Sequence, residues 1–516
     1  MDQSRTKKSI INISAALIGQ MLSLIIAFIT RIIFTRELGD IYLGINGLCT
    51  SIVGLLSLAE LGVGESINYK LYRPLAEKDI EKIKALMDLY KKVYTLIGIA
   101  VIVIGLILIP ILPLFLKEND TSSVPQLRFI FLLFVINSAS SYFYSYKRAL
   151  IISDQKRYVV TIIHYLFYCF MSIGQIIALV FTKNFILYLL IMLSCTVIQN
   201  IIISRKADKL YPFINDDYHK KLSKNDIDEI KKNTLALMYH KIGSSVVNST
   251  DNILLSKIIG ISVVGIYSNY QLITTALNTI VGQLFSAITA SVGNLGVSVN
   301  GEQSEIVLRR MFFGDFWFVS VVCTAFYSVI EILIQEWFGS DMLLDSKVLI
   351  CIVINLYLYN IRRTVWTFRD AYGLFWYDRY KALLEAIINL IFSIILGFKS
   401  GLIGILLGTI ISTITTSLWI EPYVLYKYIF GKSVLNYFIT LLKYSFITVC
   451  LCTLNKWIVI KIGFSGIEGF FLGGTLCVLL SSSIIVLLFS HSDELNYYFS
   501  LSREILKNYK ANNTKY

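Results

Sequence analysis

A stripe of polar side chains crosses residues 233–257, an otherwise apolar segment of the chain. Its members follow the first one at intervals of three, four, seven and eleven residues, which places them on one face of a helix. They are Lys241, Ser244, Ser245, Asn248 and Asn252, with Asp251 beside them. Ammonium, amide and hydroxyl groups on one face suit the binding of an anion or of a ligand rich in hydroxyl groups.

A second polar face lies in residues 9–36 and contains Gln20, Ser23 and Arg31. Next to lipid, a central Lys or Asp costs roughly 2.5–3.5 kcal/mol even on insertion scales. Both faces are therefore expected to lie against protein or a water-filled cavity. One alternative stays open for each cation, since Arg31 could extend to the outer membrane surface and Lys241 to the inner one.

The composition shows what kind of element carries these faces. Of the 516 residues, 56% are hydrophobic and 16% charged, and the mean hydropathy is +0.67. Soluble domains carry about 25% charged residues. The eight cysteines all lie in apolar stretches and the four histidines are scattered, so neither a disulfide framework nor a metal site is expected, and no cofactor. These features exclude a soluble enzyme and predict an all-α polytopic membrane protein.

We predict fourteen transmembrane helices, from apolar stretches of adequate length. They cover residues 9–36, 42–67, 93–116, 127–146, 158–181, 184–203, 233–257, 263–297, 312–334, 347–361, 381–398, 401–426, 437–455 and 464–490. Most of the 47 Lys and Arg residues fall in cytoplasmic loops if the N-terminus is cytoplasmic, and the even count then places both termini there. Topology thus explains the net charge of +13 without a nucleic-acid partner.

An internal repeat relates the two halves of the chain. The sequence TRELG at residues 35–39 recurs as SKIIG at 256–260, and Gly44-Ile45 recurs as Gly265-Ile266, each 221 positions later. Basic pairs after the fourth and tenth predicted helices match at a similar offset. Two parallel copies of a six-helix unit are typical of transporters, whose substrate site lies at the repeat interface. A duplication without transport, or a chance match, is the alternative.

The repeat leads to a predicted domain organisation. We expect an N-lobe at residues 1–203, a charged cytoplasmic linker at 204–232 and a C-lobe at 233–426. An extra helix pair at 427–490 and a cytoplasmic tail at 491–516 complete the chain.

Several short motifs resemble one known family, the Wzx-type polysaccharide repeat-unit flippases of the multidrug, oligosaccharidyl-lipid and polysaccharide exporter superfamily. The resemblance covers nearly the whole chain and depends on the order and spacing of the motifs. They are AELGVG at residues 59–64, LYRPLA at 71–76, GIYSNY at 265–270, SVGNL at 291–295, FRDAYGL at 368–374 and IEPY at 420–423.

The resemblance implies two six-helix lobes in a V, as in MATE transporters, that open alternately to each side of a bacterial plasma membrane. It implies that undecaprenyl-diphosphate-linked oligosaccharide moves from the cytoplasmic to the outer leaflet for O-antigen or capsule export. It implies cavity cations for the diphosphate, for which Arg31 and Lys241 are the best matches. Membrane lipid, a polysaccharide polymerase, glycosyltransferases and a coupling ion are the further partners that it suggests.

Three other functions are weighed against a flippase. A drug or cation antiporter of the same fold would need a carboxylate-rich N-lobe cavity, and residues 9–36 contain no central carboxylate. A membrane glycosyltransferase would need larger outer loops with patterned acidic residues, whereas the longest predicted outer loops, 117–128 and 335–347, are short. A scaffold without transport activity is the third alternative.

Overall fold

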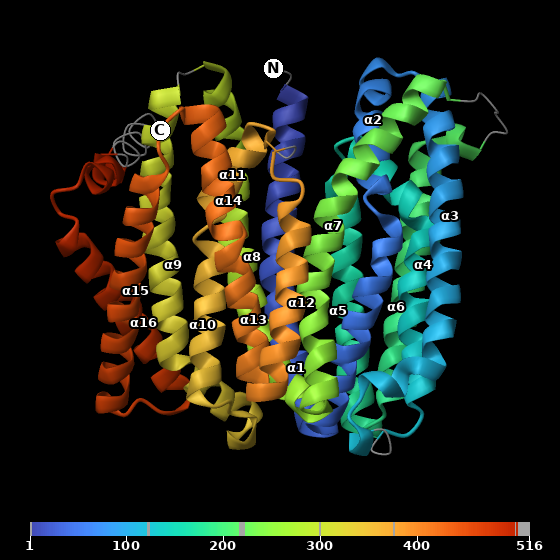
Figure 1. The fold of residues 1–516 in the computed structure, drawn as a ribbon. Coiled ribbons are helices and arrows are strands. Elements are labelled where there is room, and N and C mark those ends of the chain that lie inside the picture. Colours follow the sequence, from blue (N-terminus) through green and yellow to red (C-terminus); the bar gives the residue numbers. More distant parts are fainter. Residues whose placement is uncertain are drawn as a thin grey trace, which may run out of the picture. The chain divides into compact units, whose positions relative to one another are not determined.

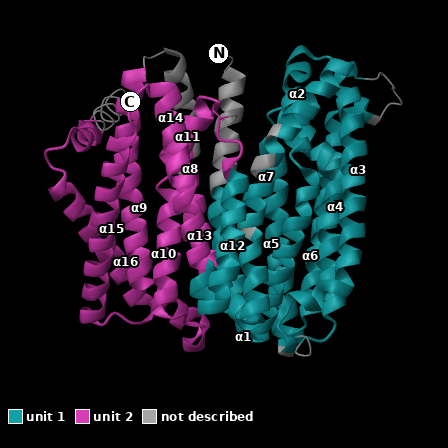
Figure 2. Cartoon of the chain, in the orientation of Figure 1, with its two compact units in different colours: residues 1–269, 382–405 teal, residues 270–381, 406–516 magenta. Residues whose placement is uncertain are grey.

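The computed structural model describes residues 3–120, 124–215, 222–298, 301–374, 377–500 and 502–503. Over these ranges the chain forms helices and no strand, which confirms the predicted all-α fold (Figure 1). Its contacts divide it into two compact units, shown in Figure 2. Unit 1 comprises residues 1–269 and 382–405, and unit 2 comprises residues 270–381 and 406–516.

Unit 1 is built mainly from the N-terminal half of the chain. Its helices are α1 (Gln3–Leu56), α2 (Val63–Glu77), α3 (Ile80–Ile111), α4 (Leu127–Ser153), α5 (Arg157–Thr182), α6 (Phe185–Leu210), α7 (Lys224–Ile258), the start of α8 (Ile261–Ser298) and α12 (Lys381–Ser400). Helix α1 packs against α5 and α7, and α4 packs against α3 and α6. Some helices begin with a side-chain cap, as where Asn184 accepts hydrogen bonds from two amides of α6.

Unit 2 contains the rest of α8 with α9 (Gly301–Phe338), α10 (Ser346–Asn360), α11 (Arg363–Ala371), most of α13 (Leu402–Thr415), α14 (Ser417–Leu425), the π-helical turn η7 (Tyr426–Phe430), α15 (Leu435–Ile462) and α16 (Gly466–Leu488). Helix α9 is its centre, since it contacts α10, α15 and α16. Phe316 of α9 stacks on Tyr444 of α15 with ring centroids 4.0 Å apart. The predicted extra helix pair, α15 and α16, is thus attached through α9.

Positive-φ glycines reverse the chain at two positions that the repeat relates. Helix α1 contains a sharp bend at Gly39, whose backbone is not helical and has φ 78°. Gly260, 221 positions later, has φ 134° and separates α7 from α8. Other residues rarely adopt such φ values, so glycine is required at both turns. The bend at Gly39 falls between the first two predicted spans, 9–36 and 42–67.

Eleven of the described helical segments are long and apolar enough to cross a membrane. One of them, Ile18–Glu60, contains the bend at Gly39 and so covers two predicted spans. Helices α7 and α8 are not among the eleven, and both contain residues whose side chains lie outside the described part of the chain. The findings are compatible with fourteen spans, and that number stays a prediction.

The two compact units divide the chain differently from the predicted lobes. Helix α7, the start of α8 and α12 belong to unit 1, although the repeat assigns all three to the lobe at residues 233–426. Contacts within one conformation define the units, whereas sequence repetition defines the lobes. The lobe assignment therefore remains a prediction.

The first turns of α7 are held to α2 and α3 by charged side chains. Asp226, in the first turn of α7, accepts a hydrogen bond from Ser223 and one from Lys82 at 3.0 Å. Lys70 of α2 lies 4.0 Å from Asp226 and pairs with Glu229. Burial disfavours the charged form of Asp226, but the Ser223 hydrogen bond and the two lysines outweigh it and lower the pKa of this carboxyl.

Candidate functional site

The two predicted polar faces lie in unit 1, one on α7 and one on the part of α1 before the bend at Gly39. Helix α7 contacts α1 after that bend, where Asn252 donates to Ser51. Gln20, Ser23 and Arg31 lie on α1, and the remaining predicted site residues lie on α7. The side chain of Asn248 lies outside the described residues, and Asp251 is half-buried. The other six side chains lie at three different depths along α1 and α7.

Arg31 lies near the end of the helix pair where the glycine turns are. Its Nη1 donates a hydrogen bond to Ser268 Oγ of α8 at 3.0 Å, and Ser268 Oγ donates to Gly265 O at 2.7 Å. Within the described part of the chain, no carboxylate lies within 4.0 Å of the guanidinium. A guanidinium has five N–H donors, so Arg31 retains capacity to bind an anion.

Asn252 occupies the position on α7 that the repeat relates to Arg31. Its Nδ2 donates to Ser51 Oγ of α1 at 3.0 Å, and its side chain is buried. Arg31 and Asn252 therefore make equivalent contacts. Each binds a serine of the other repeat, in the helical segment that follows that repeat's glycine turn.

Lys241 is paired with carboxylates in this structure. Its Nζ lies 3.6 Å from Glu60 Oε1 and 3.4 Å from Glu65 Oε1. Tyr94 Oη donates to the same Glu60 oxygen. Lys241, Glu60 and Glu65 are all partly exposed, so this ion-pair cluster is in reach of water and of a ligand. The sequence placed both acids in or beside the AELGVG motif but did not indicate that they face Lys241.

The remaining predicted residues form local hydrogen bonds. Ser244 is exposed and donates to Lys241 O at 3.2 Å. Ser23 donates to Gln20 O at 2.8 Å, and Gln20 Oε1 accepts from Tyr165 Oη of α5 at 3.3 Å. The Ser244 side chain thus remains exposed, whereas Tyr165 partly covers the Gln20 side chain.

Depth separates the two cations. Arg31 and Asn252 each lie eight residues before a glycine turn, and Lys241 lies eleven residues before Asn252. At 1.5 Å per residue, eleven residues span about 16 Å of helix. The backbones of Arg31 and Lys241 therefore lie at different depths along the helices.

We predict a difference in thiol reactivity along α7. A cysteine replacing Ser244 should react quickly with a water-soluble maleimide, because this position is exposed. A cysteine replacing Asn252 should react at least tenfold more slowly, because this side chain is buried against Ser51. Labelling of purified protein without native cysteines measures both rates. Equal rates would show that the level of Asn252 is as open to water as that of Ser244.

A buried charge cluster in unit 2 joins two of the sequence motifs. Glu421 of the IEPY motif has no exposed side-chain surface and accepts a hydrogen bond from Lys381. Arg362 Nε lies 3.7 Å from Glu421 Oε2, and Arg369 Nη1, in the FRDAYGL motif, lies 4.0 Å from Oε1. Arg369 also pairs with Asp378 at 2.8 Å. All these charges are largely buried, so the cluster is structural and holds the segment 362–381 to α14.

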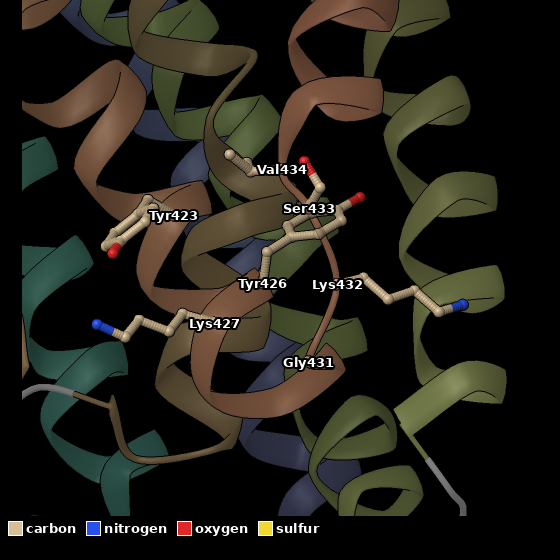
Figure 3. Close-up of a pocket in the computed structure, with 7 residues that line it drawn as sticks. All are labelled: Tyr423, Tyr426, Lys427, Gly431, Lys432, Ser433 and Val434. Carbon is tan, nitrogen blue, oxygen red and sulfur yellow. The ribbon is translucent and has the colours of Figure 1, made fainter.

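A cavity of about 430 Å³ also lies in unit 2, where η7 leads into α15. It is lined by Tyr423, Tyr426, Lys427, Gly431, Lys432, Ser433 and Val434 (Figure 3). Figure 3 shows Lys427 and Lys432 pointing in opposite directions, and Lys432 pairs with Glu305 at 2.7 Å. Its cations do not converge, so it is a poor candidate for an anionic ligand. No cluster of metal-binding side chains occurs within the described ranges.

Comparisons with known proteins identify a family for the sequence and solved structures with a similar fold. Residues 9–291 match the family described as "Polysaccharide biosynthesis protein". A search of curated proteins found no significant match.

Solved structures with the same fold extend over most of the chain. The fold is similar to that of lipid II flippase MurJ in an inward closed conformation, with a TM-score of 0.65 and 15% identity over 92% of this chain and 98% of that chain. It is similar to an inward-facing multidrug resistance MATE family transporter of the MOP superfamily, with a TM-score of 0.61 and 15% identity over 81% and 99%. A mutant of the Vibrio cholerae MATE transporter VcmN gives a TM-score of 0.54 and 13% identity over 84% and 99%. At these identities the likeness concerns the fold alone.

Proposed function

The chain belongs to the polysaccharide biosynthesis protein family, and from this membership we propose that it is a flippase for isoprenoid diphosphate-linked oligosaccharides. The family and the similar solved structures are those of flippases and transporters and not of enzymes. The cargo would move from the cytoplasmic to the outer leaflet, with both termini of the chain in the cytoplasm. A polymerase and glycosyltransferases would act after and before this step.

The observation that carries the proposal is the pair of partly buried cations on α1 and α7. A prenyl tail can stay in lipid while the head group crosses a layer about 30 Å thick. An unpaired diphosphate in a medium of low dielectric constant is very costly, so the pathway must offer cations or oriented donors. Lys241 and Arg31 supply cations at two levels about 16 Å apart. We place the diphosphate first at Lys241 and then at Arg31.

At Lys241 the diphosphate would compete with carboxylates for the same ammonium group. Glu60 and Glu65 balance this charge in the absence of cargo, so the lysine is not left unpaired in the membrane. An anion with more charge and more acceptor oxygens can replace them. Asn248, Asn252, Asp251, Gln20, Ser23 and Ser244 would supply contacts to the glycan hydroxyl groups.

Deletion of the gene in its host tests this function. We expect loss of surface polysaccharide and accumulation of lipid-linked oligosaccharide that glycosidases cannot reach from outside. The alternative, a drug or cation antiporter, predicts unchanged polysaccharide and increased sensitivity to cationic drugs. Unchanged polysaccharide in the deletion strain would contradict the flippase proposal.

A further inference from the structure

A glycine of the AELGVG motif leaves a hollow beside the ion-pair cluster of Lys241. A Cβ atom added to Gly64 of α2 would overlap Tyr94 Oη of α3. The same atom would lie 2.9 Å from Glu60 Oε1 and 2.9 Å from Tyr90 Oη. The absence of a side chain at Gly64 thus lets two tyrosine hydroxyl groups approach the Glu60 carboxylate.

Tyr94 is held in place by aromatic packing. It is 3% exposed, and its ring centroid lies 4.6 Å from that of Tyr90 and 6.0 Å from that of Tyr142. Its hydroxyl group donates to Glu60 Oε1. Because the ring is enclosed, Tyr94 is a fixed donor to this carboxylate.

Two donors share this Glu60 oxygen, and they differ in freedom of movement. Tyr94 Oη ends an enclosed ring, whereas Lys241 Nζ, 3.6 Å from Glu60 Oε1, ends a flexible and partly exposed side chain. Within the part of the chain that the structure describes, these two are the donors that contact Glu60.

The second carboxylate of the cluster has a different way to lose its partner. The Glu65 side chain is 56% exposed, so water can solvate it when Lys241 moves away. The Glu60 side chain is only 25% exposed and has less access to water. Glu60 therefore depends more on Tyr94 than Glu65 does on any protein donor.

We propose that Tyr94 is a positioning residue of the cargo site, because its hydroxyl group keeps Glu60 hydrogen-bonded when Lys241 leaves this carboxylate for a diphosphate. The proposal rests on the proposed function, which places the diphosphate first at Lys241. An ionised carboxylate without a donor is unfavourable where water has limited access. Tyr94 supplies that donor, so Lys241 can pass from the carboxylate to the cargo.

A double-mutant cycle tests this role with undecaprenyl diphosphate as the probe. Tyr94→Phe should weaken its binding to the purified protein about tenfold, the expected size for the loss of a hydrogen bond to a charged group. Glu60→Gln removes the carboxylate charge, and in this background Tyr94→Phe should change binding by less than about twofold. Equal losses in both backgrounds would mean that Tyr94 acts through packing alone and would overturn the proposal.

Tyr211→Phe is the matched control. Tyr211 Oη also donates to a carboxylate, Asp154 Oδ2, at 2.7 Å, where α6 and α4 end. Within the described residues, neither member of this pair contacts Lys241. Tyr211→Phe should therefore leave binding unchanged, and a loss equal to that of Tyr94→Phe would overturn the assignment of this role to Tyr94.

The amine reactivity of Lys241 tests the same contact without cargo. In Tyr94→Phe, Glu60 retains only the Lys241 ammonium group, so the lysine should be held more firmly in the ion pair. We expect its acetylation by a water-soluble succinimidyl ester to slow several-fold, as measured by mass spectrometry. Gly64→Ala should also slow it, because the added methyl group would displace Tyr94 Oη. Unchanged rates in both variants would overturn the proposal.

The two measurements distinguish a failure of this proposal from a failure of the proposed function. If the wild-type protein does not bind undecaprenyl diphosphate, while both variants slow the acetylation of Lys241, the proposed function is wrong and the positioning of Glu60 by Tyr94 is supported. If the wild-type protein and Tyr94→Phe bind undecaprenyl diphosphate equally well, the proposed function stands and the role of Tyr94 is overturned.

Discussion

Lys241→Ala and Arg31→Ala are each expected to reduce transport of lipid-linked oligosaccharide by about 10- to 100-fold, with normal amounts of protein in the membrane. A hydrogen bond to a charged group contributes about 1.5–3 kcal/mol, and 1.4 kcal/mol corresponds to a factor of ten. Lys241→Ala also leaves Glu60 and Glu65 without their partner, and these carboxylates would then repel the diphosphate. Flux into everted vesicles measures the effect.

Conservative variants distinguish the effect of the positive charge from the effect of the side chain's hydrogen-bonding geometry. Arg31→Lys should restore transport only in part, because an ammonium group cannot form the two parallel bonds of a guanidinium. Lys241→Arg should retain most of the transport, because the positive charge next to Glu60 and Glu65 is preserved. Wild-type rates for both alanine variants would mean that the two cations are surface anchors and do not bind cargo.

Glu421→Ala is expected to have the largest effect on folding. Glu421 is completely buried with Lys381, Arg362 and Arg369 around it. Its removal takes one negative charge out of a buried cluster and leaves Asp378 as the acid that pairs with Lys381 and Arg369. Breaking such a pair typically costs about 3–5 kcal/mol. We expect a strong loss of folded protein, measured by fluorescence-detected size-exclusion chromatography across a temperature series.

An exposed acid in the same unit provides the control for Glu421. Glu302 lies 3.8 Å from Lys432, and its side chain is 79% exposed. Glu302→Ala should leave the unfolding temperature unchanged, because exposed ion pairs contribute little. If Glu421→Ala unfolds at the wild-type temperature but does not transport, the cluster has a role in transport and the structural interpretation is wrong.

The all-α fold could be predicted because the lengths of the apolar segments and the positions of the repeated motifs can be read directly from the sequence. The bend at Gly39 lies between the predicted spans 9–36 and 42–67, where Arg36, Glu37 and Asp40 interrupt the apolar sequence. The polar stripe on α7 was found from helical spacing alone.

Partners between helices could not be predicted, because they depend on packing of segments far apart in the chain. Glu60 and Lys241 are separated by 181 positions, and the sequence did not indicate that they meet. Arg31 donates to Ser268, a contact between residues 237 positions apart that the sequence did not indicate.

Reconstitution measures the transport of diphosphate-linked oligosaccharide directly. Purified protein in liposomes should move a fluorescent undecaprenyl-diphosphate-linked oligosaccharide between leaflets at least tenfold faster than protein-free liposomes do, as measured by dithionite quenching. A lipid with the same glycan but a neutral linkage should cross at the protein-free rate, because it offers no anion to Lys241 and Arg31. Equal acceleration of the two lipids would contradict the binding of the diphosphate by Lys241 and Arg31. No acceleration of the diphosphate-linked lipid would contradict the flippase function.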